Sequence, residues 1–139
     1  MTEPADPASR RGAFGASRAA ATLLVLFVPS HQRDGTEADQ DRWVEETLRA
    51  LGTLLGGATA YPKGRGVWRD DDQGGALLFD TPVVVQCYTS EDVLLEKADA
   101  LREFLVRMGR EMRQGSIGFV IDNEFLEIRF DQQGEPIEP

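Results

Sequence analysis

The sequence predicts an α+β protein in which two amphipathic helices cover one face of an antiparallel sheet, in the order βαββαββ. Three observations lead to this fold class. Apolar runs of strand length recur along the chain, two longer segments repeat apolar residues at helical spacing, and glycine or aspartate turns separate them. This order corresponds to a ferredoxin-like (split βαβ) two-layer sandwich with one added C-terminal strand.

The length and composition fit one folded domain. The chain has 139 residues, of which 41% are hydrophobic, enough for a single core. Residues 1–18 predict a flexible N-terminal arm, residues 19–131 the α+β domain, and residues 132–139 an acidic C-terminal tail. The 24 acidic and 15 basic residues give a net charge of -9, which disfavours nucleic acid as a partner.

The first element is the apolar run Ala21–Val28, which predicts a central strand ended by Pro29. Ser9–Arg11 precedes it in the manner of a twin-arginine or secretory signal. Against export, no small-residue cleavage site follows the run, and the fold requires the run as a strand. It is also shorter than the roughly 20 apolar residues that span a bilayer. We expect a cytoplasmic protein without a membrane segment, with export as the alternative.

The first helix follows a polar loop, in which Thr36 or Asp39 can cap it, and Gly56-Gly57 ends it. Its apolar stripe consists of Val44, Leu48, Leu51 and Leu55. Short strand-like runs come next: Ala58–Tyr61, Val67–Arg69, Ala76–Phe79 and Val83–Tyr88. Asp70–Gly75 supplies a hairpin turn, and Thr81-Pro82 marks a bend or bulge in the return strand because proline lacks an N–H.

The second helix begins after Ser90, which can cap it, and ends at Gly115. Its stripe is the clearest periodicity in the chain: Leu94, Ala98, Leu101, Leu105, Met108 and Met112. Gly109 within this helix predicts close packing or a kink. The final hairpin pairs Ile117–Ile121 with Phe125–Phe130, and its turn includes an asparagine able to adopt the left-handed region.

Two helices on one face leave the second face of the sheet without cover from this chain. Apolar groups available there include residues of the Val83–Val85 run and Trp68. We therefore expect a protein partner or a second copy, with a homodimer packed through sheet faces or edges as the natural arrangement.

Two single residues carry possible chemistry. His31 is the one histidine and follows the first strand, so it could act as a general base or a single metal ligand. A solvated loop histidine is the favoured alternative, because no second histidine completes a metal set and no nucleophile pairs with it by motif. Cys87 is the one cysteine, which excludes an internal disulfide and indicates a small core residue.

The most distinctive segment is Gly64–Arg69. Its glycines permit close approach of a ligand, Arg65 and Arg69 could hold an anion, and Trp68 could stack on a ring or fill a pocket. The alternative is a twisted strand with a buried tryptophan anchor. The arginines of the second helix alternate with glutamates and indicate a solvated face.

Metal and acid–base sites are weakly indicated. Asp70–Asp72 could hold Mg²⁺ or Ca²⁺, but it lacks the EF-hand pattern, so a solvated turn is favoured. Other carboxylates gather near the C-terminus: Asp122, Glu124, Glu127 and Asp131. Acid–base catalysis requires one of them to be desolvated and positioned. We predict no metal site, no cofactor and no catalytic residue from the sequence.

The pattern Gly66-x-Trp68-Arg69-Asp70-Asp71, with the apolar strand after it and a helix ending Met108-Gly109-Arg110-Glu111-x-x-Gln114-Gly115, resembles small bacterial proteins catalogued as domains of unknown function. The similarity covers residues 22–130. The present chain departs from the pattern in a longer second helix and an added hairpin. The resemblance implies a compact α+β fold and supplies no catalytic residue.

Three hypotheses of function follow. The leading one is a non-enzymatic binding or assembly module that acts through its sheet face or Arg65–Arg69. The second is a small-metabolite enzyme of the dimeric α-β barrel type, with a cleft lined by binding residues from several elements: His31, Arg65, Trp68 and Tyr88. The third is metal-dependent nucleic-acid processing through Asp34 or Asp70–Asp72, which the net charge disfavours.

Overall fold

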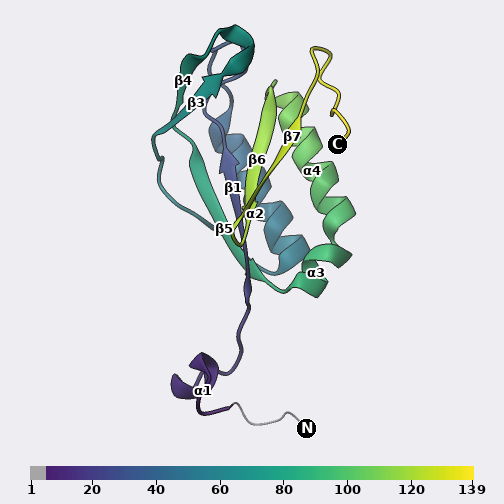
Figure 1. Ribbon diagram of the computed structural model, residues 1–139. Coiled ribbons are helices and arrows are strands. Elements are labelled where there is room, and N and C mark those ends of the chain that lie inside the picture. The colour runs from purple at the N-terminus through teal and green to yellow at the C-terminus, as the bar shows by residue number, and fades with distance from the viewer. Residues whose placement is uncertain (1–5) are drawn as a thin grey trace.

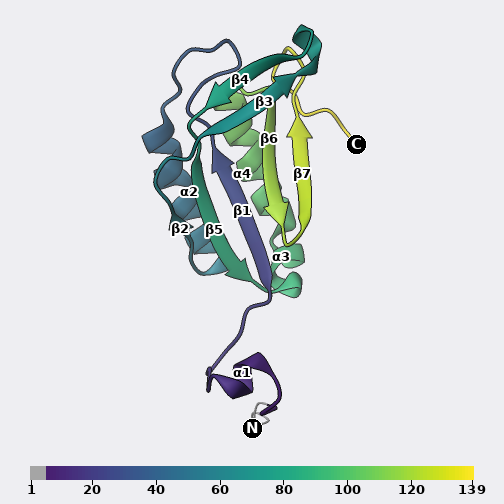
Figure 2. The same ribbon diagram turned by 60° about the vertical axis from the view of Figure 1, so that its left-hand side comes forward.

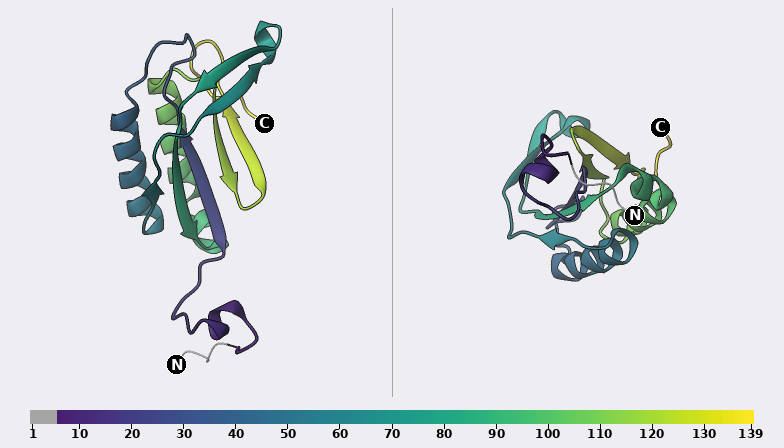
Figure 3. Two further views of the ribbon diagram at one scale, coloured as in Figure 1. Left: turned by 90° about the vertical axis from the view of Figure 1, so that its left-hand side faces the viewer. Right: turned by 90° about the horizontal axis from the view of Figure 1, so that it is seen from below.

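The computed structural model describes residues 6–139, which form an α+β domain of two layers (Figure 1). One layer is a five-stranded antiparallel sheet in the order β2-β5-β1-β6-β7. The other consists of α2 (Gln40–Leu55) and α4 (Ala98–Glu111), which lie side by side on one face of that sheet (Figure 3). The predicted α+β class, with helices on one face of an antiparallel sheet, is confirmed.

The central strand β1 (Thr22–Val28) pairs with two neighbours, β5 (Val83–Thr89) and β6 (Ser116–Ile121). The outer strands are β2 (Thr59–Ala60) and β7 (Glu124–Arg129). Residues of β1 and β5 alternate strictly between buried positions under the helices and more exposed positions on the other face. The apolar run after residue 20 is therefore a strand of the core, as predicted.

The hairpin formed by β3 (Gly66–Asp70) and β4 (Ala76–Asp80) is a separate two-stranded sheet. It projects from the end of the main sheet, and the 3-10 turn η1 (Asp71–Gln73) lies at its tip (Figure 2). The sequence predicted these strands as part of one sheet, with a bend in the return strand, and that prediction is wrong. Pro82 has no N–H to continue a ladder, so the chain changes sheet there.

The first long helix is capped as predicted but is rotated from its predicted stripe. The Asp39 side chain accepts a hydrogen bond from the Arg42 N–H at 3.3 Å, and Gly56 ends α2 with a φ of 97°. The buried face carries Trp43, Thr47 and Leu51, whereas the predicted stripe members 44, 48 and 55 are only partly buried. A threonine is tolerated in this core because its hydroxyl donates to the Trp43 carbonyl at 2.7 Å.

The second helical segment is divided into α3 (Glu91–Glu96) and α4, with Lys97 between them. The sequence predicted one continuous helix. The Ser90 hydroxyl caps α3, as predicted, by accepting from the Val93 N–H at 3.3 Å. Most of the predicted stripe is buried under the sheet, including Leu101, Leu105, Met108 and Met112. The helical periodicity therefore identified the correct face although not the break.

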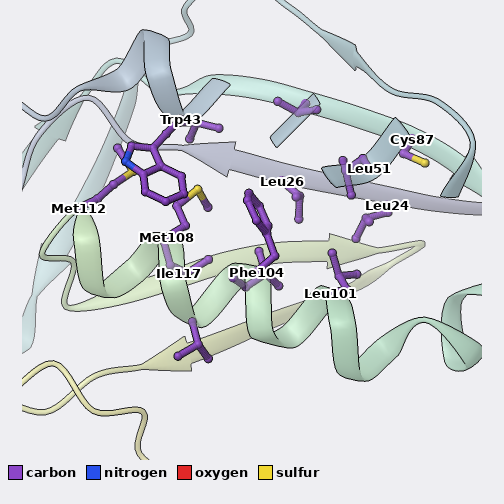
Figure 4. Close-up of a cluster of buried hydrophobic side chains, with 14 of the residues drawn as sticks. Leu24, Leu26, Trp43, Leu51, Cys87, Leu101, Phe104, Met108, Met112 and Ile117 are labelled. Atoms are coloured by element: carbon purple, nitrogen blue, oxygen red, sulfur yellow. The ribbon is translucent and has the colours of Figure 1, made fainter. Parts of the chain in front are cut away.

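The core lies between α2, α4 and the sheet, where side chains from both helices meet those of β1 (Figure 4). Trp43 is its largest member, with a ring centroid 6.2 Å from that of Phe104. Cys87 belongs to the same core, and burial raises the pKa of its thiol. The prediction that Cys87 is a small core residue is confirmed.

Gly109 of α4 lies where a side chain has no room. A methyl group there would overlap the ring of Phe130, and it would also press on Ile117. Close packing, not a kink, is the reason for this glycine. Gly52 of α2 is the matched position, because a methyl group there meets nothing within 4 Å.

Gly109→Ala is therefore expected to lower the free energy of unfolding by about 1–3 kcal/mol through overpacking, even though alanine favours helix by about 1 kcal/mol over glycine. Gly52→Ala is expected to raise it by up to about 1 kcal/mol. Urea denaturation of the two variants measures both changes. Stabilisation of equal size in both would show that the Phe130 ring does not occupy the space beside Gly109.

The two ends of the chain differ in how they contact the rest of the domain. Residues 1–5 of the predicted flexible arm lie outside the described residues, and α1 (Arg10–Ala13) follows with no buried side chain. The acidic C-terminal tail lies against α4, where Arg110 pairs with Glu135 at 2.6 Å and Arg102 with Glu138 at 3.6 Å. None of the helices in residues 6–139 is long and apolar enough to cross a membrane.

The face of the main sheet opposite the long helices is open (Figure 3). Its side chains include Phe27 and Val84, which are partly buried, and Tyr88 and Phe125, which are at least half exposed. The last hairpin turns at Asp122, whose φ is 55°. The sequence had assigned this left-handed position to the neighbouring asparagine. Asp122 also accepts from the Leu23 N–H and so joins the turn to β1.

Candidate functional site

A cavity of about 290 Å³ lies where the end of β1 meets the base of the β3–β4 hairpin. We call it the junction pocket. Its lining residues come from the loop after β1, from the start of β3 with the residue before it, and from the end of β4 with the residue after it: His31, Arg65, Gly66, Phe79, Asp80 and Thr81. The pocket forms because the chain leaves one sheet for the other at this point, so the loop after β1 lies against the base of the hairpin.

The loop that carries His31 is held in place by backbone hydrogen bonds. The Gln32 N–H donates to the Thr36 carbonyl at 2.7 Å, and the Ala38 N–H donates to the Ser30 carbonyl at 3.0 Å. The Gln114 side-chain amide donates to the His31 carbonyl at 2.7 Å. Because both sides of the loop are tied to the domain, the histidine sits at a defined position and not on a freely moving segment.

Asp80, which lines the junction pocket, is hydrogen-bonded to the buried residue Ser30 beside it. The Asp80 carboxylate accepts from the Ser30 N–H at 3.0 Å and also from the Ser30 hydroxyl. The same hydroxyl oxygen accepts from the Thr81 N–H at 3.1 Å and lies 2.7 Å from Nδ1 of His31. A carboxylate, a hydroxyl and an imidazole are thus linked in one chain of hydrogen bonds, although 50 residues separate the first two in sequence.

Arg65 supplies the positive charge of the pocket. It is exposed, and within residues 6–139 it forms no ion pair. The backbone beside it is fixed, because the Gly64 N–H donates to the Pro82 carbonyl at 2.8 Å and Gly66 pairs with Asp80. Its guanidinium is therefore available to a ligand at the pocket, on a backbone that is held in place.

The five predicted binding residues fall into three places. His31 and Arg65 line the junction pocket together, and the indole nitrogen of Trp68 lies beside Gly66 at its edge. Arg69 is nearer the tip of the hairpin and pairs with Asp71. Tyr88 lies near the other end of β5, opposite Leu23. The predicted cleft therefore brings two of its four residues together, with a third adjoining, and leaves out Tyr88.

Trp68 itself is not a buried anchor. Its side chain is 45% exposed, and neighbouring apolar groups of the hairpin are also exposed, with Phe79 at 73%. The tryptophan that anchors the core is Trp43, which the predicted helix stripe had omitted. The twisted-strand interpretation with a buried tryptophan is therefore wrong, because the hairpin stands away from the core.

The carboxylates proposed as metal ligands take part in local structure. Asp70 accepts from the Asp72 N–H at 3.1 Å, and Asp71 pairs with Arg69. Hydrogen bonds from Thr36 lower the pKa of Asp34. In the part of the chain that the structure describes, no three acids, histidines or cysteines gather as a metal site. These groups offer no support for the metal-dependent hypothesis.

A larger hollow of about 730 Å³ lies on the outer side of α4. Its three arginines pair with glutamates of the same helix, of α2 and of the C-terminal tail. Arg107 pairs with Glu111 at 3.7 Å, and two further arginines of the hollow pair with tail glutamates. Because the positive charges of this hollow are paired within the chain, the junction pocket, whose Arg65 is unpaired among the described residues, is the better candidate for a binding site.

Sequence reasoning missed Ser30, Asp80 and Thr81. The interpretation treated Ser30 as the start of a loop and Thr81 as part of a bend. The sequence did contain a signal for these residues. Ser30 comes just after the apolar run of the first strand, and Asp80 and Thr81 come just before Pro82. Their meeting depends on the antiparallel register that places Val28 opposite Val83. No local motif reports that register.

No protein-family model matches the chain, and no curated protein matches it in sequence. The resemblance to small bacterial domains of unknown function stays a prediction. Two solved structures match in fold. One is a phage SAM lyase in complex with S-methyl-5′-thioadenosine, with a TM-score of 0.64 and 15% identity over 84% of this chain and 97% of the other. This chain shares that fold.

The other is a phage SAM lyase in its apo state, with a TM-score of 0.57, 18% identity, and coverage of 81% of this chain and 91% of the lyase chain. The likeness to enzymes overturns the leading prediction of a non-enzymatic binding or assembly module. That prediction was wrong because it rested on the absence of catalytic groups that lie close together in the sequence. The polar groups of the junction pocket come from three separate segments of the chain.

Proposed function

We propose that this chain is a small-molecule enzyme that acts on S-adenosylmethionine or a closely related sulfonium nucleoside, and that the junction pocket is part of its active site. The observation that carries the proposal is the shared fold, which extends over 97% of the lyase chain at a TM-score of 0.64. The second sequence hypothesis, a small-metabolite enzyme with a cleft near His31 and Arg65, is the one that this likeness favours.

The chemistry of the pocket supports the proposal. An imidazole, a guanidinium and a carboxylate line one small cavity beside an aromatic ring. Such a mixture of a few placed polar groups with apolar walls is typical of small-ligand sites. These residues lie together in the chain itself, independently of any residue of the lyase.

The overall charge also supports a cationic substrate. The net charge of -9 raises the local concentration of cations around the protein. S-adenosylmethionine carries a sulfonium cation, so this field favours its approach, whereas it disfavours nucleotides that carry phosphates.

We propose that the main sheet has the ferredoxin-like layout that the sequence predicts. In that layout β1, β2, β5 and β6 are the four strands of the split βαβ unit, and β7 extends its edge. The β3–β4 hairpin is then an insertion between the second and third strands. The junction pocket lies at the base of that insertion.

We also propose that the enzyme works as an assembly of identical copies joined through the β3–β4 hairpin. Large apolar side chains on both of its faces are 45–73% exposed: Val67, Trp68, Leu77, Leu78 and Phe79. An isolated two-stranded hairpin is marginally stable in water without such cover. A second copy supplies a matching apolar surface by symmetry and would also close the pocket, to which Phe79 belongs.

The test is to incubate the full chain with S-adenosylmethionine and follow release of S-methyl-5′-thioadenosine by chromatography. In that reaction the bond between sulfur and Cγ of the methionine part breaks, and its electron pair stays on sulfur. The four-carbon fragment closes on its own carboxylate, loses a proton to form an alkene, or takes up water and releases a proton. Mass spectrometry of that fragment distinguishes the three outcomes.

We expect release of the nucleoside by the wild-type chain, and at least a tenfold slower reaction for Arg65→Met. The matched control is Arg49→Met on the outer side of α2, where Arg49 pairs only with Glu45 in the described residues. It should react at the wild-type rate. The proposal is wrong if the folded wild-type chain neither consumes S-adenosylmethionine nor binds S-methyl-5′-thioadenosine.

A further inference from the structure

The Ser30 hydroxyl uses its full hydrogen-bonding capacity. A serine hydroxyl has one proton to donate and two lone pairs to accept with. Its neighbours are the Asp80 carboxylate, the Thr81 N–H and Nδ1 of His31. A carboxylate cannot donate, so the hydroxyl proton goes to Asp80. The hydroxyl oxygen must then accept from the other two groups.

This arrangement determines which nitrogen of His31 carries the proton. With the hydroxyl proton directed to Asp80, the contact of 2.7 Å between the Ser30 oxygen and Nδ1 is a hydrogen bond only if Nδ1 is protonated. A neutral imidazole then has a free lone pair on Nε2. Among residues 6–139, the structure gives Nε2 no hydrogen-bond partner. His31 lines the junction pocket, so Nε2 is the nitrogen left for a ligand.

The charged and polar groups of the pocket therefore favour a ligand that carries both a negative and a positive charge. Arg65 offers a guanidinium, which pairs best with a carboxylate. Asp80 contributes negative charge, and His31 offers an acceptor nitrogen, so both favour a donor with positive charge. An α-amino acid group has a carboxylate and an ammonium on the same carbon, and it matches this set of groups. A cavity of about 290 Å³ is large enough for it.

We propose that the junction pocket binds the amino-acid end of the substrate. Arg65 holds the carboxylate, and His31 and Asp80 accept from the ammonium. Ser30 is a positioning residue, which acts by holding His31 in the Nδ1-protonated tautomer. The assignment of the amino-acid end rests on the proposed function, whereas the tautomer follows from the hydrogen bonds alone.

The tautomer is directly measurable because His31 is the one histidine of the chain. Nitrogen NMR of the protein labelled at histidine reports which ring nitrogen is protonated, at a pH where the imidazole is neutral. We expect Nδ1–H in the wild type and in Ser30→Thr, which keeps the hydroxyl. Ser30→Ala should shift the population towards Nε2–H. An Nε2–H tautomer in the wild type would overturn this part of the proposal.

The binding assignment is tested with two ligands that share the nucleoside and differ in the amino-acid end. S-adenosylhomocysteine retains that end, and S-methyl-5′-thioadenosine lacks it. Calorimetric titration should show that Arg65→Met binds S-adenosylhomocysteine about 10–100-fold more weakly than the wild type does, as for loss of a charged hydrogen bond. Its affinity for S-methyl-5′-thioadenosine should stay within about twofold.

The outcomes separate this inference from the proposed function. If Arg65→Met weakens both ligands equally, the pocket does not bind the amino-acid end, although the proposed function stands. If the wild type binds neither ligand, the proposed function and the assignment fail together. Arg49→Met, in which the lost charge lies outside the pocket, should bind both ligands as the wild type does.

Discussion

Replacing Trp43 with alanine is expected to lower the free energy of unfolding by about 3–5 kcal/mol, the cost of removing a large aromatic side chain from a packed core. The side chain is 2% exposed, and it packs against Phe104 under the sheet. Arg42 and Arg107 also lie over its ring at 5.0 and 5.2 Å. Small domains have about 5–15 kcal/mol of stability in total, so this is a large fraction of it.

The other tryptophan is the matched control. Trp68 is 45% exposed on the hairpin, so Trp68→Ala should change the stability of the single chain by less than about 1 kcal/mol. It should instead weaken self-association through the hairpin, which sedimentation measures. Urea denaturation at two protein concentrations separates the effects, because a loss due to association depends on concentration and a loss of core packing does not.

A second substitution covers the case in which Trp43→Ala does not fold. Trp43→Phe keeps most of the apolar area, and it should fold with a smaller loss of stability than the alanine variant. Equal stability losses for Trp43→Phe and Trp68→Ala at high dilution would contradict the assignment of Trp43 as the main core anchor. Wild-type protein that remains a single chain at all concentrations would contradict the assembly through the hairpin.

Substitution of Asp80 is expected to give the largest effect on activity, and two variants separate its roles. Asp80→Asn keeps an oxygen that can accept from the Ser30 N–H and hydroxyl, but it removes the negative charge. We expect its stability to stay within about 1 kcal/mol of the wild type. Its KM for S-adenosylmethionine should rise about 10–100-fold, because the ammonium loses a charged partner.

Asp80→Ala removes both the charge and the acceptor. The Ser30 N–H, on a residue that is 8% exposed, then loses its partner, which should cost about 1–3 kcal/mol of stability. The catalytic rate should fall as well, because the Ser30 hydroxyl is free to rotate and no longer holds the His31 tautomer. Steady-state kinetics and thermal melts on the same preparations measure the two effects. If both variants show the wild-type KM, Asp80 does not contact the substrate.

More of the main sheet and its helices than of the candidate site could be predicted from the sequence. Most of the predicted strand and helix segments lie close to where the sequence places them, because apolar periodicity and turn residues act locally. The predicted return strand is instead two strands in different sheets, and the second helix is divided at Lys97. Gly109 was also interpretable, since a glycine inside a long helix indicates either close contact or a bend. The rotation of α2 could not be predicted from the sequence, because Trp43 and Thr47 enter the core through contacts with other elements.

The candidate site shows the same division. His31, Arg65 and Trp68 were identified as chemically suitable residues, and their types alone justified that choice. Their grouping with Ser30 and Asp80, and the separation of Tyr88 from them, follow from strand register and from the change of sheet at Pro82. A register is set by pairing between segments far apart in sequence, so no local pattern reports it.

By itself, the sequence determined that this chain is an acidic α+β domain with two helices on one face of an antiparallel sheet. Those properties depend on side-chain spacing within single segments. Only the tertiary structure decided that the β3–β4 hairpin leaves the main sheet, and that a serine, a histidine and an aspartate meet at its base. Those properties depend on which segments pair with each other. Chain topology sets that pairing, and local preference does not.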